Sequence, residues 1–423
     1  MKNIINHLKI FSTLKNKLFP FYKKKETSEL MSILQNQNES KLNSAMFVGG
    51  CVRKHLRNET VDDIDIATIY SPKELKKIFL GSKYKLIETG LKHGSITLVR
   101  EGKKFELTVL RKDIKTDGRF AEIEKIDDWV EDSKRRDFTI NSIYMNRKGK
   151  IFDPQSGTKD LENGIIKFIG DPSKRIEEDY LRIIRYIRFS LQYEKNSDES
   201  TIKVIKLNLN GIKKISKERL FSELMKILNL GNFLEINNRS NLKEIINLVF
   251  PELLYLDRLK KIKMIPEYLK IDQEFLLAVL LIGEKNNHDY FCHKYNVTNH
   301  LRKEFAIIAK GFLNSYNNKS FFSTEIKKNI YIFGKTRIIK ILIIDFLNSK
   351  EKNIKNILIT IDRIKKFNVP KFPYDGQYLK ERGIKEGKKL GFVLKEMESK
   401  WISNDFKISE KEITFIINKK INY

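Results

Sequence analysis

The spacing of apolar residues changes once along the chain, and this change limits the folds that the chain can adopt. Between about residues 45 and 145, short stretches alternate apolar and polar residues, which is typical of half-buried strands. Beyond the turn-rich segment 153–164, apolar residues recur at helical spacing, first over 174–193 and again over 217–230. The sequence therefore predicts a small sheet with flanking helices, followed by a long helical remainder.

Local signals place the elements of the sheet region. The run AMFVGG at 45–50 predicts a strand that ends in a tight glycine turn, and a helix can follow over 51–58. DIDIAT at 63–68 alternates as a strand does, and the Ser-Pro pair at 71–72 marks the start of a helix. Two alternating stretches around Glu101–Gly102 predict a β-hairpin.

The length and composition narrow the class of protein. A chain of 423 residues predicts two to four domains, and a formal charge of +28 indicates a polyanionic partner such as nucleic acid. A skewed genomic composition rich in Lys, Asn and Ile could also raise the charge, so charge alone does not settle the partner. The two cysteines leave no room for a disulfide framework, and we expect a reducing compartment, the cytoplasm.

Neither the apolar runs nor the start of the chain indicates a membrane protein. The longest apolar run, 275–282, is far shorter than the roughly 20 residues of a spanning helix. The first 25 residues are basic but lack the unbroken apolar core and cleavage site of a secretory signal. We therefore expect a surface helix there rather than a targeting segment, and no membrane partner.

Two aspartates in DIDIAT are the first candidates for chemistry. On a strand, Asp63 and Asp65 share one face, separated by roughly 6.6 Å, while Ile64 points to the other face. Like charges on one face repel unless a cation lies between them, and Mg²⁺ binds one or two carboxylates together with substrate phosphates. The alternative is a solvated strand face, which is the commoner origin of an isolated D-x-D.

Two neighbouring features favour a metal site. Gly49 and Gly50 allow backbone N–H groups to approach a phosphate closely. In FELTVL, Phe105 and Leu107 share the core face, which leaves Glu106 on the polar face as a third acid. Three acids from two strands beside a glycine turn are typical of metal-dependent phosphoryl or nucleotidyl transfer.

Taken together, these segments resemble the nucleotidyltransferase superfamily, in the branch that holds class II CCA-adding tRNA nucleotidyltransferases and bacterial poly(A) polymerases. The resemblance rests on VGGCVR, DDIDIAT, GLKHGSITLV, FELTVLR, DGR, RRDFTIN, GTKDL and EEDYLRIIRYIRF, in that order. It implies an α+β nucleotidyltransferase head with a small mixed sheet, followed by an all-α neck, body and tail. The expected parts are a basic helical segment 1–30, the head 31–145, the neck 146–205, the body 206–300 and a tRNA-contacting tail 301–423.

The resemblance also implies roles for single residues. Asp63 and Asp65 would bind two Mg²⁺ ions, Glu106 would be the third catalytic carboxylate, and Asp62 would be structural. The loop that receives the triphosphate matches Gly49, Gly50 and Arg53. The segment that holds ribose and phosphates matches Arg135, Arg136, Asp137 and Asn141. One departure is Lys54, because the family usually has an acid after the arginine of its glycine loop.

The segment EEDYLRIIRYIRF would read the base. Asp179 and Arg182 are three apart on the predicted helix, so they share a face and could equally form a simple salt bridge. Cytosine and adenine both present an amino donor beside a ring-nitrogen acceptor, which a carboxylate beside a guanidinium complements, whereas uracil and guanine do not. Glu178 would orient the pair and Arg185 would extend the nucleotide site. Arg119 in DGR would belong to a loop that switches from C to A.

The implied function is template-independent addition of CCA to the 3′ end of tRNA from CTP and ATP, with release of pyrophosphate. The alternatives are a poly(A) polymerase, an enzyme that adds only CC or A, and a catalytically silent RNA-binding protein. The stretch TGLKHGSITLVREGKKFELTVLR at 89–111 favours the CCA-adding form. A zinc site in HDYFCHKYNVTNH at 288–300 is not expected, because its spacing fits no common ligand pattern. The oligomeric state stays open.

Overall fold

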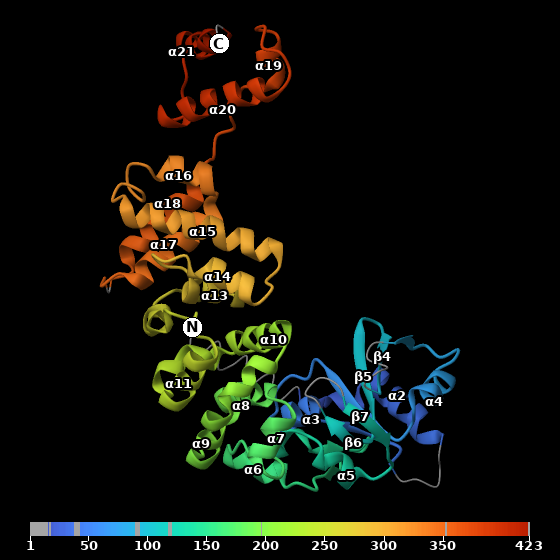
Figure 1. Ribbon diagram of the computed structural model, residues 1–423. Coiled ribbons are helices and arrows are strands. Elements are labelled where there is room, and N and C mark those ends of the chain that lie inside the picture. The colour runs from blue at the N-terminus through green and yellow to red at the C-terminus, as the bar shows by residue number, and fades with distance from the viewer. Residues whose placement is uncertain are drawn as a thin grey trace. The chain divides into compact units, whose positions relative to one another are not determined.

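The computed structural model describes residues 16, 18–37, 43–88, 94–116, 121–195, 197–351 and 353–421. Contacts along the chain divide it into two compact units, Met1–Val249 and Phe250–Tyr423. Within the described residues, strands occur in the first unit alone, whereas helices occur in both (Figure 1). The predicted α+β region with a helical remainder is therefore confirmed. The finer boundaries at 30, 145, 205 and 300 stay predictions.

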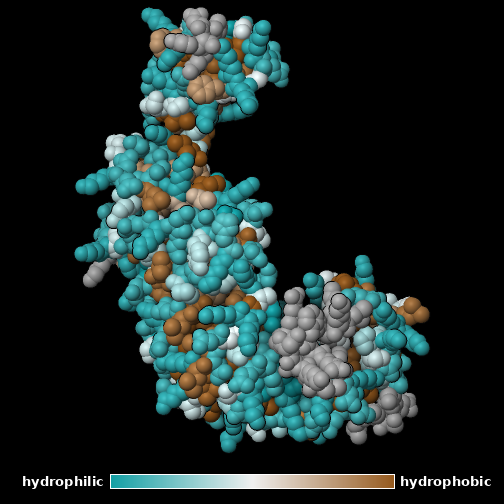
Figure 2. Space-filling view, viewed as in Figure 1, coloured by the Kyte–Doolittle hydropathy of each residue, from teal (hydrophilic) through white to brown (hydrophobic). Residues whose placement is uncertain are grey.

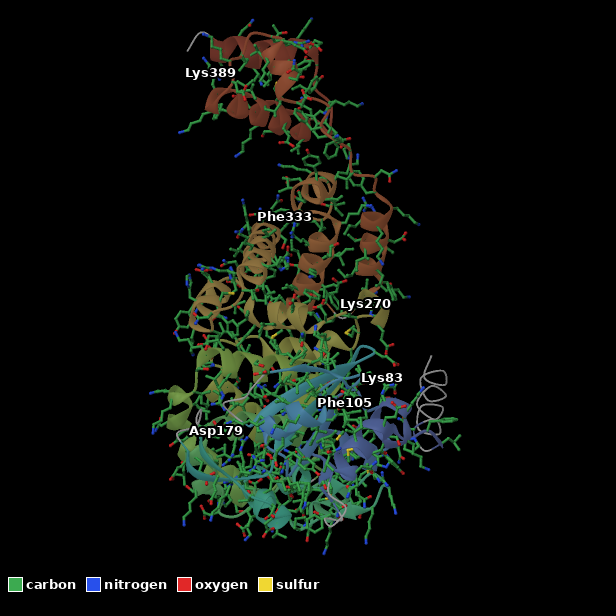
Figure 3. All side chains as sticks on the ribbon, turned by 90° about the vertical axis from the view of Figure 1, so that its right-hand side faces the viewer. Lys83, Phe105, Asp179, Lys270, Phe333 and Lys389 are labelled. Atoms are coloured by element: carbon green, nitrogen blue, oxygen red, sulfur yellow. The ribbon has the colours of Figure 1, made fainter. Side chains whose placement is uncertain are left out.

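A mixed sheet of seven strands forms the centre of the first unit, in the order β3-β4-β5-β2-β1-β8-β9. Its strands are β1 Ala45–Val48, β2 Ile64–Thr68, β3 Lys85–Ile87, β4 Ser95–Arg100, β5 Lys103–Val109, β8 Tyr144–Met145 and β9 Ile151–Phe152. β2 and β5 are parallel, and the other neighbours are antiparallel. Phe105, labelled in Figure 3, is fully buried in this sheet.

The predicted hairpin joins β4 to β5. Its loop contains Glu101 at φ 51° and Gly102 at φ 76°, and two consecutive positive φ values match the twist of a tight two-residue hairpin. A separate two-stranded ladder, β6 Arg111–Thr116 and β7 Ala121–Lys125, follows β5. The predicted switch residue Arg119 falls between these two strands and lies outside the described residues.

The first unit also contains helices. They are α2 Lys25–Asn36, α3 Gly50–Leu56, α4 Pro72–Ile78, α5 Trp129–Lys134, α6 Gly157–Asn163, α7 Pro172–Glu178, α8 Leu181–Tyr193, α9 Glu199–Asn208, α10 Lys217–Leu228 and α11 Ser240–Val249. α4 begins where the sequence predicts, with Ser71 and Glu74 forming a capping box. α3 packs on β1 and β2, and α8 packs on α10.

One predicted helix is interrupted. The sequence predicts a continuous helix over 174–193, but α7 ends at Glu178, and Asp179 is extended with φ −155° and ψ 103°. The Asp179 carboxylate accepts a hydrogen bond from the Leu181 backbone N–H at 3.1 Å, so it caps the start of α8. The prediction is wrong because local capping by an aspartate outcompetes the continuous apolar periodicity.

The second unit consists of helices in its described part. They are α12 Leu259–Ile262, α13 Gln273–Leu281, α14 Asn287–Lys294, α15 Asn299–Asn317, α16 Ile326–Phe333, α17 Lys335–Asn348, α18 Lys355–Lys366, α19 Gly376–Lys380, α20 Lys388–Ser403 and α21 Glu410–Ile421. α13 carries most of the long apolar run and is buried along its length from Phe275. α19, α20 and α21 share a small core of their own around Val393 and Met397.

Short 3₁₀ segments connect these helices and strands. They are η1 Phe21–Lys23, η3 Thr139–Asn141, η4 Leu209–Lys214, η5 Gly231–Asn238, η6 Leu256–Arg258 and η7 Glu267–Leu269. The face drawn in Figure 2 is mainly hydrophilic, with apolar residues scattered over it. A search of the described residues finds no helix with the length and apolar character needed to cross a membrane.

Candidate active site

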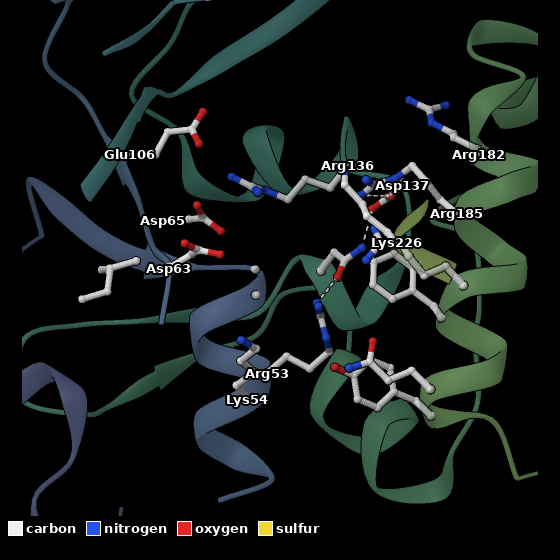
Figure 4. A pocket seen from close by; sticks show the side chains of 18 of the residues that line it. Arg53, Lys54, Asp63, Asp65, Glu106, Arg136, Asp137, Arg182, Arg185 and Lys226 are labelled. Atoms are coloured by element: carbon white, nitrogen blue, oxygen red, sulfur yellow. Dashed lines mark hydrogen bonds and ion pairs between the residues drawn. The ribbon is translucent and has the colours of Figure 1, made fainter. Parts of the chain in front are cut away.

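One cavity of the first unit collects the residues that the sequence predicts to act. Its volume is about 990 Å³, and its walls come from β2, β5, the start of α3, η3, α7 and α8. Every predicted site residue within the described part of the chain lines it, from Gly49 to Arg185 (Figure 4). Segments separated by more than a hundred positions therefore meet in one place.

The sheet end of the cavity carries three carboxylates. Because β2 and β5 are parallel neighbours, Asp65 lies directly opposite Glu106, and Asp63 stands just before β2 on the same face. Figure 4 shows the three side chains directed toward a common space. Burial raises the pKa of Asp65 to about 6, with Glu106 and Asp63 adding to the effect and nearby arginines opposing it.

These carboxylates fit a divalent cation that also binds substrate. No hydrogen bond or ion pair from the described residues reaches the side chains of Asp63, Asp65 and Glu106, so their negative charge is uncompensated at close range. Among the described residues, no group of three or more His, Cys, Asp or Glu side chains is arranged to hold a metal ion by itself. Mg²⁺ binds through one or two carboxylates plus phosphate oxygens, so this donor set suits it once a triphosphate is present.

A glycine turn lies beside the carboxylates. Gly49 adopts φ 71°, a left-handed conformation that favours glycine, and leads into α3. A Cβ atom at Gly50 would lie 3.6 Å from Asp65 Oδ2, an ordinary van der Waals distance, so the turn lies directly beside this carboxylate. Cys51 is fully buried, and burial raises the pKa of its thiol to about 12. The turn thus leaves backbone and space open to a ligand.

Asp132 is a functional candidate that the sequence reasoning missed. Its side chain is 0 % exposed and holds Arg135 at 2.7 Å and Arg136 at 2.9 Å. Tyr144 also donates its hydroxyl to Asp132 Oδ2 at 2.7 Å. Burial alone would raise the pKa of Asp132, but Arg136 and Arg135 outweigh it and lower the pKa to about 2. The i+3 and i+4 spacing in DSKRR was the available signal.

Asp137 is the centre of a second network. Its Oδ2 pairs with Arg185 Nη2 at 2.6 Å, and its Oδ1 accepts a hydrogen bond from Asn141 Nδ2 at 2.8 Å. Asn141 in turn accepts a hydrogen bond from Arg53 through its Oδ1. Burial opposes ionisation of Asp137, yet Arg185 and Asn141 lower its pKa well below the usual range. This network connects α3, η3 and α8.

The predicted base-reading residues do not pair as a simple i,i+3 salt bridge. Arg182 Nη1 instead lies 2.6 Å from Glu178 Oε2 and donates to the Arg175 carbonyl at 2.5 Å. Asp179 binds Arg219 of α10 at 2.7 Å. The orienting role predicted for Glu178 fits this arrangement, because Glu178 fixes one side of the Arg182 guanidinium.

Several further residues of the cavity were not among the predicted site residues. Glu223 of α10 does not line the cavity, but it is buried and lies 2.9 Å from Arg188 and 2.8 Å from Lys226, which do; no motif in the sequence singles it out. On α8, Phe189 and Tyr193 line the wall at helical spacing, which in the sequence looks like core packing. Gln192 lines the same wall.

Two features noted in the sequence, Lys54 and the histidine-containing segment, can be placed in the structure. Lys54, where the family usually has an acid, pairs with Asp62 at 3.2 Å, so the two ends of the loop carry opposite charges. In the histidine-containing segment, His288 and Cys292 are buried in α14, whereas His293 lies 3.8 Å from Asp289 at the surface. The carboxylate Asp289 also pairs with Arg302 at 3.0 Å.

Comparisons with known proteins agree with this geometry. Two family models match, "Poly A polymerase head domain" over residues 45–167 and "Probable RNA and SrmB-binding site of polymerase A" over 197–254. Mitochondrial CCA tRNA nucleotidyltransferase 1 of Danio rerio is 30 % identical over 389 residues, covering 87 % of this chain and 85 % of its own. The CCA-adding enzyme of Ligilactobacillus salivarius is 29 % identical over 407 residues, covering 94 % and 97 %.

A solved structure supports the fold over nearly the whole chain. The Bacillus stearothermophilus CCA-adding enzyme in complex with CTP superposes with a TM-score of 0.72 at 22 % identity. The alignment covers 94 % of this chain and 98 % of that protein. At 22 % identity this likeness supports the fold alone, whereas the two relatives named above support the family.

Proposed function

The chain belongs to the family of CCA tRNA nucleotidyltransferases, and from this premise we propose that it adds C, C and A to the 3′ end of tRNA. CTP and ATP supply the nucleotides, and each addition releases pyrophosphate. The observation that carries this proposal is the single cavity that is lined both by the carboxylates of β2 and β5 and by Asp179 and Arg182 at the helical end. One pocket can thus hold both ends of a nucleotide.

Base selection follows from the carboxylate and the guanidinium at the helical end. Cytosine and adenine each present an amino donor beside a ring-nitrogen acceptor, so Asp179 can accept from the amino group while Arg182 donates to the nitrogen. Glu178 and the Arg175 carbonyl already hold the Arg182 guanidinium, which reduces the entropy lost on binding. Uracil and guanine present a carbonyl beside an N–H, which mismatches both groups.

The triphosphate fits the basic middle of the cavity. Arg53 follows the glycine turn, and Arg135 and Arg136 are oriented by the buried carboxylate of Asp132. A planar guanidinium can contact two phosphate oxygens at once. Asp137 and Asn141 fix the neighbouring side chains, and Asp137 has remaining acceptor capacity toward ribose hydroxyls.

The family implies dependence on a divalent metal, and we propose Mg²⁺ held by Asp63 and Asp65, with Glu106 beside them. When bound, such ions lower the pKa of the attacking 3′ hydroxyl and stabilise the leaving pyrophosphate. Asp65 and Glu106 are adjacent because of the β2–β5 register, so the chain itself sets the separation of these two carboxylates. Removal of divalent cations with EDTA, followed by addition of Mg²⁺, tests this part of the proposal.

A poly(A) polymerase is the rival function, because the head matches a family model described for that enzyme. The discriminating experiment supplies purified protein with Mg²⁺ and a tRNA that lacks its terminal CCA, using CTP alone, ATP alone and both. We expect two C additions with CTP alone and a complete CCA with both, after which extension stops. A long A tail on unstructured RNA would instead establish the rival.

We also propose that the enzyme works in the cytoplasm. The two cysteines, Cys51 and Cys292, are free and buried, which suits a reducing compartment. The relative from Danio rerio is named as a mitochondrial protein. Fractionation of cells that express the tagged full chain distinguishes these locations.

A further inference from the structure

The phenyl ring of Phe189 on α8 lies against three guanidinium groups of the cavity. Its centroid is 4.3 Å from the guanidinium carbon of Arg188, 4.9 Å from that of Arg53 and 5.4 Å from that of Arg185. All three arginines line the cavity, as Phe189 does. One neutral side chain therefore touches cations that come from both α3 and α8.

The ring is held in place by other aromatic residues. Tyr193 stacks on Phe189 with a centroid separation of 6.3 Å and an interplanar angle of 20°, and Phe138 packs against it at 5.5 Å and 75°. Phe189 is 2 % exposed. Because these contacts fix the orientation of the ring, they also fix where a cation can lie against it.

Arg53 depends on these rings more than its neighbours do. Arg185 and Arg188 pair with the carboxylates of Asp137 and Glu223, but no ion pair within the described residues neutralises Arg53. Its Nη1 donates to the Asn141 side chain, and its buried Nε has no hydrogen-bond partner. The guanidinium carbon also lies 5.2 Å from the Tyr193 centroid, and the residue is 7 % exposed.

A ring orients a cation without cancelling its charge. The face of an aromatic ring attracts a guanidinium through its quadrupole, and it adds no net negative charge to the site. A carboxylate in the same place would neutralise Arg53 and would also repel an incoming triphosphate. The aromatic contact thus keeps Arg53 in position and still positively charged.

We propose that Phe189, supported by Tyr193, is a positioning residue for nucleotide binding that directs Arg53 toward the triphosphate. Phe189 and Tyr193 form an aromatic platform that joins α3, which follows the glycine turn, to α8, which carries the base-reading arginine. This inference rests on the proposed function, because it requires that the cavity bind CTP and ATP. It adds a role for a side chain that the sequence alone classes as core packing.

The decisive test changes the electron density of the ring and leaves its shape nearly unchanged. Phenylalanine with one, two or five ring fluorines is incorporated at position 189 of the full chain, because fluorine progressively weakens the negative face. We expect the KM for CTP and ATP to rise stepwise, reaching about tenfold, while kcat stays within about twofold. A KM that is unchanged across the series overturns the proposal.

Substitutions by natural amino acids provide the matched comparison. F189L keeps an apolar side chain of similar size but removes the ring, so we expect about the same tenfold rise in KM. F233L is the control, because Phe233 is equally buried in η5, which packs on α8, and does not line the cavity. Equal KM changes in both variants would contradict a specific role. If F189L does not fold, the fluorinated series decides.

Failure of the inference is separable from failure of the proposed function. Equilibrium binding of CTP and ATP to the wild-type and fluorinated chains measures the platform without any transfer reaction. If the wild type adds no nucleotide to tRNA, the proposed function fails whatever position 189 does. If the wild type is active but the fluorinated chains bind CTP and ATP as tightly as the wild type does, the proposed function stands and the role proposed for Phe189 is wrong.

Discussion

The carboxylates at the two ends of the cavity have opposite surroundings. At the sheet end, Asp65 and Glu106 face each other with no hydrogen bond or ion pair from the described residues, and burial raises the pKa of Asp65. At the helical end, Asp132, Asp137 and Glu223 are more enclosed, with side chains 0 %, 10 % and 4 % exposed, and each one pairs with arginine. The first group is poised to accept a cation that the chain does not supply, and the second group positions cations that it does.

This difference separates two uses of the same chemical group. An uncompensated buried carboxylate destabilises the fold, so its presence indicates a ligand that compensates it. When a carboxylate is paired with arginines, removal of one partner is strongly destabilising, because the other charge stays buried without compensation. Substitutions at the two ends should therefore have opposite effects on stability, although both reduce activity.

The largest expected effect comes from the sheet end. Asp65→Asn removes a proposed metal ligand, so we expect CCA addition to fall by at least about 1,000-fold. The same change relieves repulsion with Glu106, and the melting temperature in EDTA should rise by about 3 °C. Primer extension and calorimetry measure the two results. Activity near that of the wild type, or a lower melting temperature, would contradict the assignment.

The next effect tests the helical end. Asp132→Asn removes the buried carboxylate that pairs with Arg135 and Arg136, so the free energy of unfolding should fall by about 3 kcal/mol, as measured in urea. The KM for both nucleotides should rise because the arginines lose their orientation. Glu131→Gln, on the same helix but with a partly exposed partner, is the control and should change stability by less than about 0.5 kcal/mol.

A smaller effect appears as a dependence on pH. The pKa of Asp132 lies near 2 in the folded chain, below the usual value of 3.8, so the unfolded chain binds the proton first as pH falls. The stabilisation by Asp132 is complete above about pH 5 and is lost progressively toward pH 2, with about 1 kcal/mol gone at pH 3. Urea unfolding of wild type and Asp132→Asn at pH 5 and pH 3 measures this loss as a difference. If the free energy of unfolding changes equally between pH 5 and pH 3 in the two proteins, the prediction is wrong.

The smallest effect is expected next to the metal site. Asp62 is 69 % exposed, and within the described residues its ion pair is with Lys54, so Asp62→Asn should change the free energy of unfolding by less than about 0.5 kcal/mol. CCA addition should stay within about twofold of the wild type. A loss of activity comparable to that of Asp65→Asn would show that Asp62 also takes part in catalysis.

Much of the sheet and the carboxylate end could be predicted from local pattern. The period of two places Asp65 and Glu106 on polar faces, and the structure confirms both strands and the hairpin between β4 and β5. The network around Asp132 could have been found from its spacing to Arg135 and Arg136. The end of α7 could not, because the helical periodicity continues through Asp179 while a side-chain cap interrupts the backbone.

The residue pattern alone determined the α+β and helical regions, the three acids and the family resemblance, because period, charge and motif order are local properties of the chain. Tertiary structure decided which side chains act together. Register places Asp65 beside Glu106, the packing of α8 on α10 brings Glu223 to Arg188, and Phe189 meets Arg53 of a distant helix. Contacts between residues far apart in sequence depend on how elements pack, and no local pattern encodes that packing.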